Sequence, residues 1–167
     1  NFSLGTALLD IALKSECKHF LNIDTSLPAS ANSYASYKSE FREIAKSKIE
    51  EKNINFINMT LENVYGPGDM DSKLIPSLIR SCQQGKQYIN LSQGSQRRDF
   101  IFIDDAVRAL LAIIYNLKFD QLHKYKEIPI ASSELYSIRE IAETIKSLLN
   151  SDIELRFGKE REIFEEE

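Results

Sequence analysis

The chain has 167 residues, a formal net charge of −4 and a composition of 43% hydrophobic and 28% charged residues. Such a length can bury a core of its own, and the composition is that of a globular protein. The negative charge and the lack of a basic stripe argue against a nucleic-acid partner. No apolar run approaches the roughly 20 residues of a membrane span, so we expect no membrane partner either.

Cysteine and histidine are sparse. Cys17 and Cys82 are far apart in sequence, and His19 and His123 are isolated. We therefore expect two reduced thiols in a cytoplasmic protein and no metal site. The chain begins without Met, inside a segment with helical spacing, which suggests a fragment of a longer protein.

Hydrophobic spacing predicts helices that alternate with short strands. Helices are expected at 1–15, 34–52, 74–82, 104–114 and 138–149. Strands are expected at 19–24, 54–61, 87–91, 99–103, 127–131 and 153–157, with a turn at 65–69. Asp104 should cap its helix, and Ser137 with Glu140 should form a capping box. This alternation predicts an α/β fold with a largely parallel sheet.

Tyr34 and Lys38 form the most informative pair in the chain. They stand four residues apart near the start of a predicted helix, so both side chains lie on one face. An isolated phenol titrates near ~10, and a positive charge beside it lowers that pKa. The pair therefore indicates a proton donor and acceptor that works near neutral pH. The pair by itself leaves open a packed ring beside a solvated cation.

Three more polar positions lie next to predicted strands. Thr25 ends the first strand and Asn63 follows the second, so both fall at the sheet edge where α/β folds bind ligands. Arg97 and Arg98 precede a later strand, and guanidinium groups suit a diphosphate. Taken singly, Thr25 and Asn63 could be turn residues, and the arginines could form surface ion pairs.

The order of these motifs resembles that of the extended short-chain dehydrogenases/reductases. More narrowly, it is similar to the NAD-dependent epimerase/dehydratase family, which acts on nucleotide sugars. The motifs are Gly5-Thr6-x-Leu8-Leu9, Thr25, Tyr34-x-x-x-Lys38, Asn63-Val64-Tyr65-Gly66-Pro67-Gly68-Asp69 and Arg97-Arg98-Asp99-Phe100-Ile101-Phe102-Ile103-Asp104-Asp105. Residues 22–28 look most like members related to CDP-abequose synthase. The chain resembles the C-terminal portion of such proteins.

This resemblance implies a fold and two regions. The fold would be α/β, the C-terminal part of a Rossmann-like doubly wound parallel sheet plus a small α/β substrate-binding region. Residues 1–69 would form the C-terminal part of the Rossmann-like domain. Residues 70–167 would form mainly the substrate-binding region, with 99–131 returning to the Rossmann-like core.

The resemblance also implies roles for single residues. Tyr34 would be the general acid/base toward a sugar hydroxyl or carbonyl, and Thr25 would supply a supporting hydroxyl. Lys38 would hold the nicotinamide ribose and favour the phenolate form of Tyr34, and Leu61 would line the cofactor site. The residues implied in binding a nucleotide-diphosphate sugar are Asn63, Lys73, Arg98 and Arg161.

Two features shape the expected reaction. The glycine-rich phosphate loop that such proteins carry upstream is not in this sequence, so the cofactor could be NAD or NADP. Ser26-Leu27 follows Thr25 where dehydratases commonly have Asp-Glu. We therefore expect a nucleotide-sugar epimerase or a 4-keto-sugar reductase, in which hydride transfer is coupled to proton transfer by Tyr34, Lys38 and Thr25.

Two alternatives to an active enzyme stay open. The chain could be a non-catalytic dinucleotide-binding sensor or pseudoenzyme of the same fold, although the complete set of Tyr34, Lys38 and Thr25 argues against that. It could also be a truncated fragment that is inactive on its own.

The helices at 1–15 and 34–52 suggest self-association. In the family that the chain resembles, the equivalent helices often pack against their twins. The sequence permits a homodimer through these helices, with Phe41 and Ile44 offering apolar area. The alternative is that both helices simply cover the sheet.

Overall fold

The structure is a computed structural model that describes residues 2–50, 52–116 and 124–159. The chain divides into two compact units. Unit 1 consists of Asn1–Glu62 and Asp104–Ala131, and unit 2 of Asn63–Ile103 and Ser132–Glu167.

Unit 1 is built on a three-stranded parallel sheet. Its strands β1 (His19–Thr25), β2 (Asn55–Leu61) and β6 (Tyr125–Ile130) lie in the order β1-β2-β6. β2 is buried along most of its length, as expected for the central strand of a sheet that is covered on both faces.

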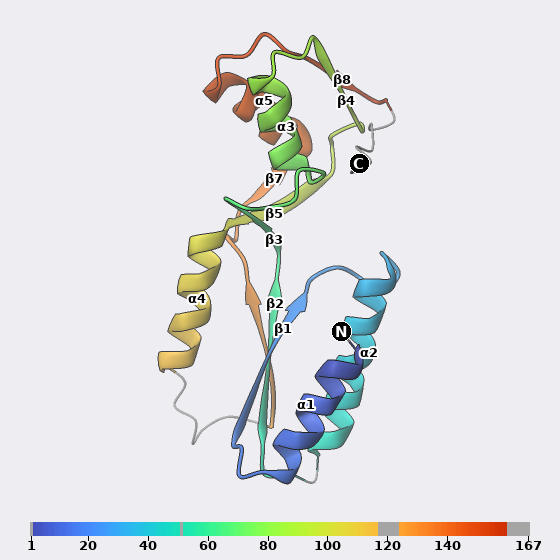
Figure 1. Cartoon of the computed structure of the whole chain (residues 1–167), viewed down its shortest axis with the longest axis vertical. Helices are drawn as coiled ribbons and strands as arrows, with labels where there is room; N and C mark the ends of the chain where they lie inside the picture. Colours follow the sequence, from blue (N-terminus) through green and yellow to red (C-terminus); the bar gives the residue numbers. More distant parts are fainter. Residues whose placement is uncertain (1, 51, 117–123, 160–167) are drawn as a thin grey trace. The chain divides into compact units, whose positions relative to one another are not determined.

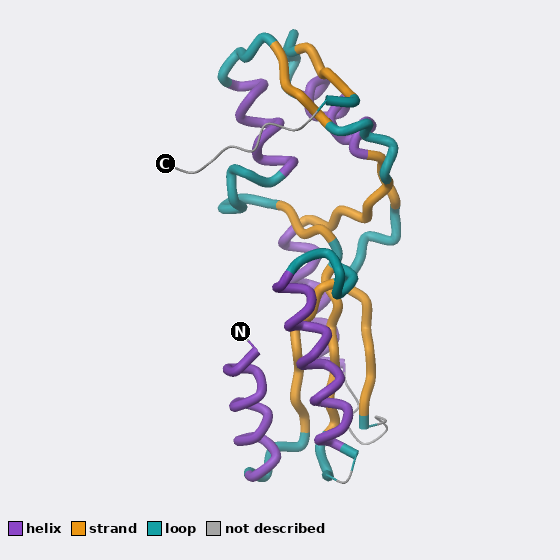
Figure 2. Tube along the Cα trace, turned by 90° about the vertical axis from the view of Figure 1, so that its right-hand side faces the viewer, coloured by secondary structure: helices purple, strands orange, loops and turns teal. Residues whose placement is uncertain are grey.

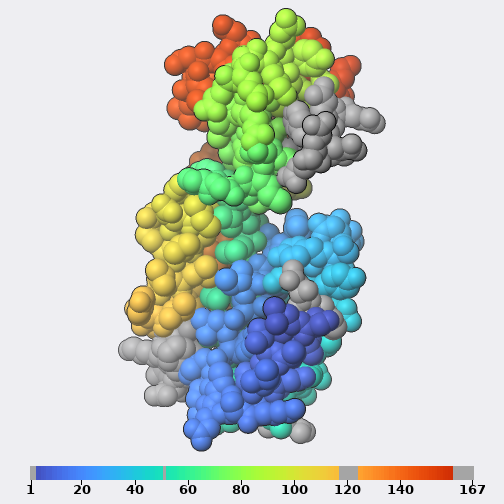
Figure 3. Space-filling view, in the orientation of Figure 1, coloured from blue at the N-terminus to red at the C-terminus, as the bar shows by residue number. Residues whose placement is uncertain are grey.

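Helices lie on both faces of this sheet. α1 (Phe2–Lys14) and α2 (Ser33–Ile49) cover one face, and α4 (Ile103–Asn116) lies on the other, as Figures 1 and 2 show. The space-filling view shows α1 in dark blue and α2 in light blue side by side at the surface (Figure 3). Parallel strands need such crossovers, because a tight turn cannot join them.

A row of aromatic rings fills the space between α2 and the sheet. Phe20, Phe56 and Tyr125 are paired across the three strands, so their side chains share one face. Their rings stack nearly parallel, with centroids 5.3 Å apart for Phe20–Phe56 and 5.9 Å apart for Phe56–Tyr125. Phe41 of α2 packs onto Phe56 at 6.0 Å and 57°. Aromatic burial of this kind supplies a large share of a core's stability.

Unit 2 combines short strands with two helices. β3 (Asn63–Tyr65) pairs parallel with β5 (Arg97–Phe102), and β5 pairs antiparallel with β7 (Leu135–Ser137). β4 (Tyr88–Leu91) pairs parallel with β8 (Glu154–Phe157). The helices are α3 (Leu74–Gln83) and α5 (Ile138–Leu148).

The core of unit 2 is aliphatic. Its buried side chains are Leu78, Cys82, Ile89, Leu91, Ala142 and Ile153. α5 begins with the predicted capping box: Ser137 Oγ accepts from the Glu140 amide at 3.1 Å, and Glu140 accepts from the Ser137 amide at 2.7 Å.

The predicted α/β fold with a largely parallel sheet is confirmed, since four of the five strand pairings among the described residues are parallel. Two details differ from the sequence prediction. Asp104 does not cap its helix, because α4 already begins at Ile103 and Asp104 lies in its first turn. The three-residue strands β3 and β7 were not predicted, because so short a segment shows no alternation of its own.

Among the described residues, no helix combines the length and apolar character that a bilayer crossing requires.

Candidate active site

The first two turns of α2 carry the predicted acid/base pair. Asn32 is the N-cap of α2, and its side chain accepts a hydrogen bond from the Ala35 amide at 2.9 Å. Capping fixes the first turn of a helix, because it satisfies an amide that has no partner within the helix. Tyr34 and Lys38 are therefore carried by an ordered helical start.

Tyr34 and Lys38 lie together on one face of α2, as their spacing predicts. Lys38 Nζ is 5.8 Å from the centroid of the Tyr34 ring, and it donates a hydrogen bond to the Ile23 carbonyl at 2.5 Å. Both residues line a hollow of about 320 Å³, together with Gly5 and Asn22. Tyr34 is 44% exposed, so its hydroxyl is accessible to a ligand.

Thr25 ends β1, as expected, but lines a different hollow of unit 1. This second hollow measures about 380 Å³ and is polar, with Arg42 and Glu62 among its lining residues. Thr25 Oγ1 accepts from the Leu27 amide at 3.2 Å, which is the turn role considered for it. Leu61 pairs with Thr25 across the sheet and is half-buried at the end of β2.

A polar row crosses the same face of the sheet one step beyond the aromatic row. Asn22 pairs with Asn58, and Asn58 with Glu127, in strand register. Asn22 Nδ2 donates to Asn58 Oδ1 at 2.7 Å, and Asn58 Nδ2 donates to Asp24 Oδ2 at 2.8 Å. Asn58 is fully buried and Asp24 nearly so. Buried polar groups need such partners to offset their lost hydration.

Arg42 of α2 joins this network from the helix that covers the sheet. Its Nε lies 3.1 Å from Asp24 Oδ2, and its Nη1 lies 3.5 Å from Glu127 Oε1. The sequence analysis missed this network. Arg42 was not singled out, because a charged side chain on an amphipathic helix normally lies on the solvated face. The available signal was the spacing of four residues from Tyr34 to Lys38 to Arg42, which places all three along one stripe.

Asn63 and Asp99 of unit 2 are held by contacts with the backbone. Asn63 Nδ2 donates to the Asp99 carbonyl at 2.8 Å, and the Asp99 carboxylate accepts from the Ser132 and Ser133 amides, both at 2.8 Å. Asp99 thereby joins β5 to the segment that leads to β7. Its carboxylate forms no ion pair among the described residues.

The two arginines of β5 lie at the surface. Arg97 Nη2 donates to the Leu135 carbonyl at 2.6 Å, and Arg98 Nη1 to the Arg97 carbonyl at 3.0 Å. Surface ion pairing, the alternative considered for both, is not seen for either of them within the described ranges. The Arg98 guanidinium keeps most of its five N–H donors for a ligand.

Lys73 and Arg161 are the other two predicted substrate contacts. Lys73 is the residue before α3, and its Nζ is 2.7 Å from Asp69 Oδ1. Arg161 lies outside the described residues.

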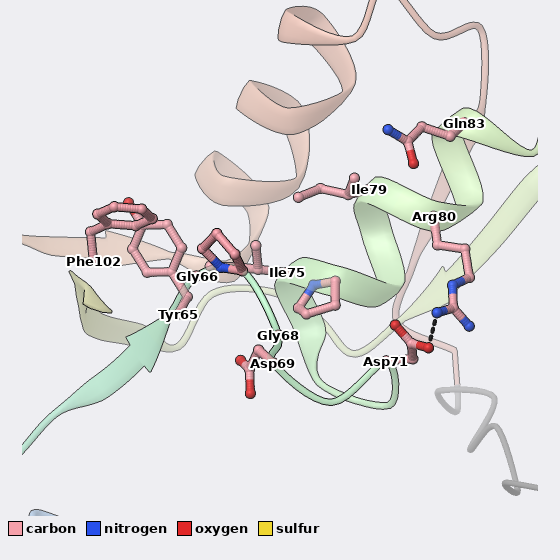
Figure 4. A pocket seen from close by; sticks show the side chains of 12 residues that line it. Tyr65, Gly66, Gly68, Asp69, Asp71, Ile75, Ile79, Arg80, Gln83 and Phe102 are labelled. Carbon is pink, nitrogen blue, oxygen red and sulfur yellow. Dashed lines mark ion pairs between the residues drawn. The ribbon is translucent and has the colours of Figure 1, made fainter. Parts of the chain in front are cut away.

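Unit 2 also contains the hollow drawn in Figure 4, of about 480 Å³. The rings of Tyr65 and Phe102 meet edge to face on one side of it, with centroids 5.5 Å apart. Arg80 of α3 forms an ion pair with Asp71 on the other side. Of the predicted substrate contacts that the structure describes, Asn63, Lys73 and Arg98, none lines this hollow.

The parts of the chain that the structure describes contain no cluster of metal-binding side chains. They contain no group of three or more His, Cys, Asp or Glu side chains that could hold a metal ion. Cys17 and Cys82 are both free, and Cys17 Sγ donates to the His19 carbonyl at 3.1 Å.

Comparison with known proteins places the chain in a family. Residues 1–126 match the model of the NAD dependent epimerase/dehydratase family. The chain is 34% identical over 139 residues to CDP-abequose synthase of Salmonella typhimurium, which covers 80% of this chain and 46% of that protein. It is 29% identical over 136 residues to dTDP-4-dehydro-6-deoxy-D-allose reductase of Streptomyces bikiniensis, covering 79% and 40%. The chain therefore belongs to the NAD-dependent epimerase/dehydratase family.

Solved structures agree on the fold. The UDP-glucuronic acid 4-epimerase of Bacillus cereus, solved with UDP-glucuronic acid and NAD, aligns with a TM-score of 0.81 at 22% identity, covering 96% of this chain and 55% of that one. MoeE5, solved with UDP-glucose and NAD, aligns with a TM-score of 0.77 at 20% identity, covering 96% and 57%. The chain thus spans about half the length of the relatives that it matches.

Proposed function

We propose that the protein containing this chain is a nicotinamide-dependent enzyme that reduces or epimerises a nucleotide-diphosphate sugar. The observation that carries the proposal is the Tyr34–Lys38 pair, held on one face of α2 with the ammonium 5.8 Å from the ring. Family membership supports it, because the family is NAD-dependent. Unit 1 would belong to the Rossmann-like cofactor domain, and unit 2 would bind the substrate.

Tyr34 would act as the general acid/base on the sugar oxygen. Its ring is partly exposed, and a phenol can both donate and accept a proton in hydrogen bonds to a substrate oxygen. The nicotinamide, when bound, supplies or accepts the hydride at the sugar carbon. Thr25, at the end of β1, would steady the same oxygen as a second hydroxyl donor.

Lys38 fits a role in holding the nicotinamide ribose. An ammonium carries three donors, and one of these is directed at the Ile23 carbonyl. Two donors therefore remain for ribose hydroxyls. Leu61, half-buried at the end of β2, would give this site an apolar wall.

Arg98, Asn63 and Lys73 would bind the nucleotide diphosphate, with Arg161 as a further contact. Arg98 supports this role best, since its guanidinium is exposed and contacts only a backbone carbonyl in the described structure. A guanidinium binds phosphate oxygens in pairs, which a lysine cannot do.

The sequence argues against dehydration, and one relative supports reduction of a 4-keto sugar. Ser26-Leu27 follows Thr25 in place of the acidic pair expected of a dehydratase, and one relative is named as a reductase of a 4-dehydro sugar. The intact protein is expected to oxidise NADH or NADPH when given a nucleotide 4-keto sugar. An epimerase would interconvert sugars with no net change in cofactor. A Tyr34→Phe variant that kept full turnover would refute the proposal.

A homodimer through α1 and α2 is part of this proposal. Leu4, Leu8 and Ile11 form an exposed apolar stripe on α1, with exposures of 62%, 49% and 64%. Phe41, expected to offer apolar area, is instead buried against Phe56 and cannot contribute. Light scattering of the intact protein and a Leu8→Glu variant tests the dimer: the variant should be monomeric, and a monomeric parent would rule the dimer out.

We further propose that the protein works in the cytoplasm. The two free cysteines support this, because thiols stay reduced there.

A further inference from the structure

Asp24 is the point where α2 is tied to the sheet. Lys38 Nζ donates to the Ile23 carbonyl, which belongs to the peptide bond that joins Ile23 to Asp24. One helical turn further on, Arg42 Nε lies 3.1 Å from Asp24 Oδ2. The other carboxylate oxygen, Oδ1, accepts from the Thr25 amide at 2.8 Å. Two adjacent residues of β1, Ile23 and Asp24, therefore connect to Lys38, Arg42 and Thr25.

The carboxylate is held rigidly by its surroundings. The Asp24 side chain has no exposed area, and Asn58 donates to the same oxygen that faces Arg42. Asn22 in turn orients the Asn58 amide, because it donates to Asn58 Oδ1 at 2.7 Å. The pair thus rests on Asn58, which is fully buried, and on Asn22, which is partly buried.

Arg42 supplies the charge that this carboxylate needs. A buried carboxylate without a counter-charge is strongly unfavourable. The contact of Arg42 Nε with Asp24 is an ion pair that lacks hydrogen-bond geometry, so it supplies charge at close range. Arg42 reaches across to Glu127 of β6 with Nη1 at 3.5 Å, so it links α2 to both outer strands of the sheet. Two anchors one turn apart, Lys38 and Arg42, prevent α2 from rotating about its own axis.

We propose that Asp24 and Arg42 are positioning residues for Tyr34 and Lys38. Their buried ion pair sets the rotation of α2 on the sheet, and so sets where the phenol and the ammonium lie relative to the end of β1. This inference rests on the proposed function, since it concerns the same site. Misplacement of a reacting group by about 1 Å can lower a rate roughly a hundredfold, so a small rotation of α2 is sufficient to matter.

The test compares single and paired substitutions in the intact protein, with kcat and KM measured alongside thermal unfolding. Arg42→Gln is expected to lower kcat about ten- to hundredfold while KM for the nucleotide sugar changes less than about twofold. Arg42→Lys, which restores the charge without the fork, should recover much of that loss. Asp24→Asn combined with Arg42→Gln removes the unpaired charge, so Tm should recover while kcat stays low.

The paired variant separates positioning from mere stability. If the ion pair only stabilised the fold, kcat would return together with Tm, and that result would overturn the proposal. An Arg42→Gln variant with unchanged kcat would overturn it as well. Where Arg42→Gln does not fold, the paired variant and Arg42→Lys decide the question.

Two controls complete the design. Glu43→Gln breaks an exposed ion pair with Lys46 on the same helix, and it should leave kcat and KM unchanged. Tyr34→Phe, measured in the same assay, tests the proposed function itself. Loss of turnover in Tyr34→Phe with full turnover in the Arg42 variants would reject only the positioning role.

Discussion

Unit 1 and unit 2 hold their polar residues in different ways. In unit 1, Asp24, Asn58 and Arg42 are buried or partly buried and connect to one another through side chains. In unit 2, Arg97 and Arg98 are exposed, and each donates a hydrogen bond to a backbone carbonyl. A proton-transfer pair needs a fixed geometry, whereas a residue that binds a flexible diphosphate needs a side chain that is free to move. The contrast matches the roles proposed for the two units.

Substitutions in the cores of the two units should have the largest effects on stability. Phe56 in unit 1 and Leu78 in unit 2 are both fully buried. Phe56→Ala should lower the free energy of unfolding by about 3–5 kcal/mol, and Leu78→Ala by about 2–5 kcal/mol, because each leaves a cavity. Hydrogen exchange should show lost protection mainly in the unit that carries the substitution. An even loss over both units would show that the two unfold as one.

A glycine in unit 2 gives the next largest effect. A Cβ on Gly66 would lie 2.4 Å from Ile103 Cγ2, closer than any normal contact. Gly66→Ala should therefore lower the free energy of unfolding by about 1–3 kcal/mol, as overpacking does. Denaturant unfolding measures this loss.

Gly85→Ala is the matched control for Gly66. Gly85 has a φ of +65° but no atom near its Cβ position, so only backbone strain is introduced. We expect a loss of about 1 kcal/mol, since left-handed backbone disfavours a side chain. An equal loss at both glycines would show that the contact with Ile103 relaxes freely.

Removing a helix cap should destabilise the two units by about the same free energy, which allows their effects on activity to be compared. Asn32 caps α2 in unit 1, and Ser137 caps α5 in unit 2. Asn32→Ala and Ser137→Ala should each lower the free energy of unfolding by about 1 kcal/mol. Only Asn32→Ala should also lower kcat, because it loosens the turn that carries Tyr34. Equal kcat values in the two variants would contradict the assignment of α2 as the catalytic helix.

The smallest effect concerns alkaline pH. Burial, followed by the negative charge of Glu127, raises the pKa of the Tyr125 phenol above its usual value. The protonated phenol is thus favoured in the fold, and the stability it contributes is present below pH ~10 and is lost as pH rises beyond that. Tyr125→Phe should flatten this alkaline decline in urea unfolding.

Tyr115→Phe is the control for that measurement, since Tyr115 is 81% exposed. It should leave the alkaline decline unchanged. If Tyr125→Phe and Tyr115→Phe gave the same pH dependence, burial of Tyr125 would not be its cause.

Much of the fold could be predicted from local patterns. Helical spacing located α1, α2 and α3 to within a few residues, and the Ser137–Glu140 capping box is confirmed. The prediction that Asp104 caps α4 was wrong, because α4 already begins at Ile103. A strand that runs directly into a helix leaves no loop to mark where the helix begins. β3 and β7 were missed because each has only three residues and depends on pairing with β5.

The sequence by itself determined the alternation of helices and strands, the shared face of Tyr34 and Lys38, and the family resemblance, because these depend on order and spacing along the chain. Only the tertiary structure decided that Arg42 turns inward to Asp24 and that Phe41 is buried instead of available to a partner. A charged or aromatic side chain on a helix has the same local signature in either setting. Which setting it occupies depends on the strand register that brings Asn22, Asn58 and Glu127 into one row beneath α2.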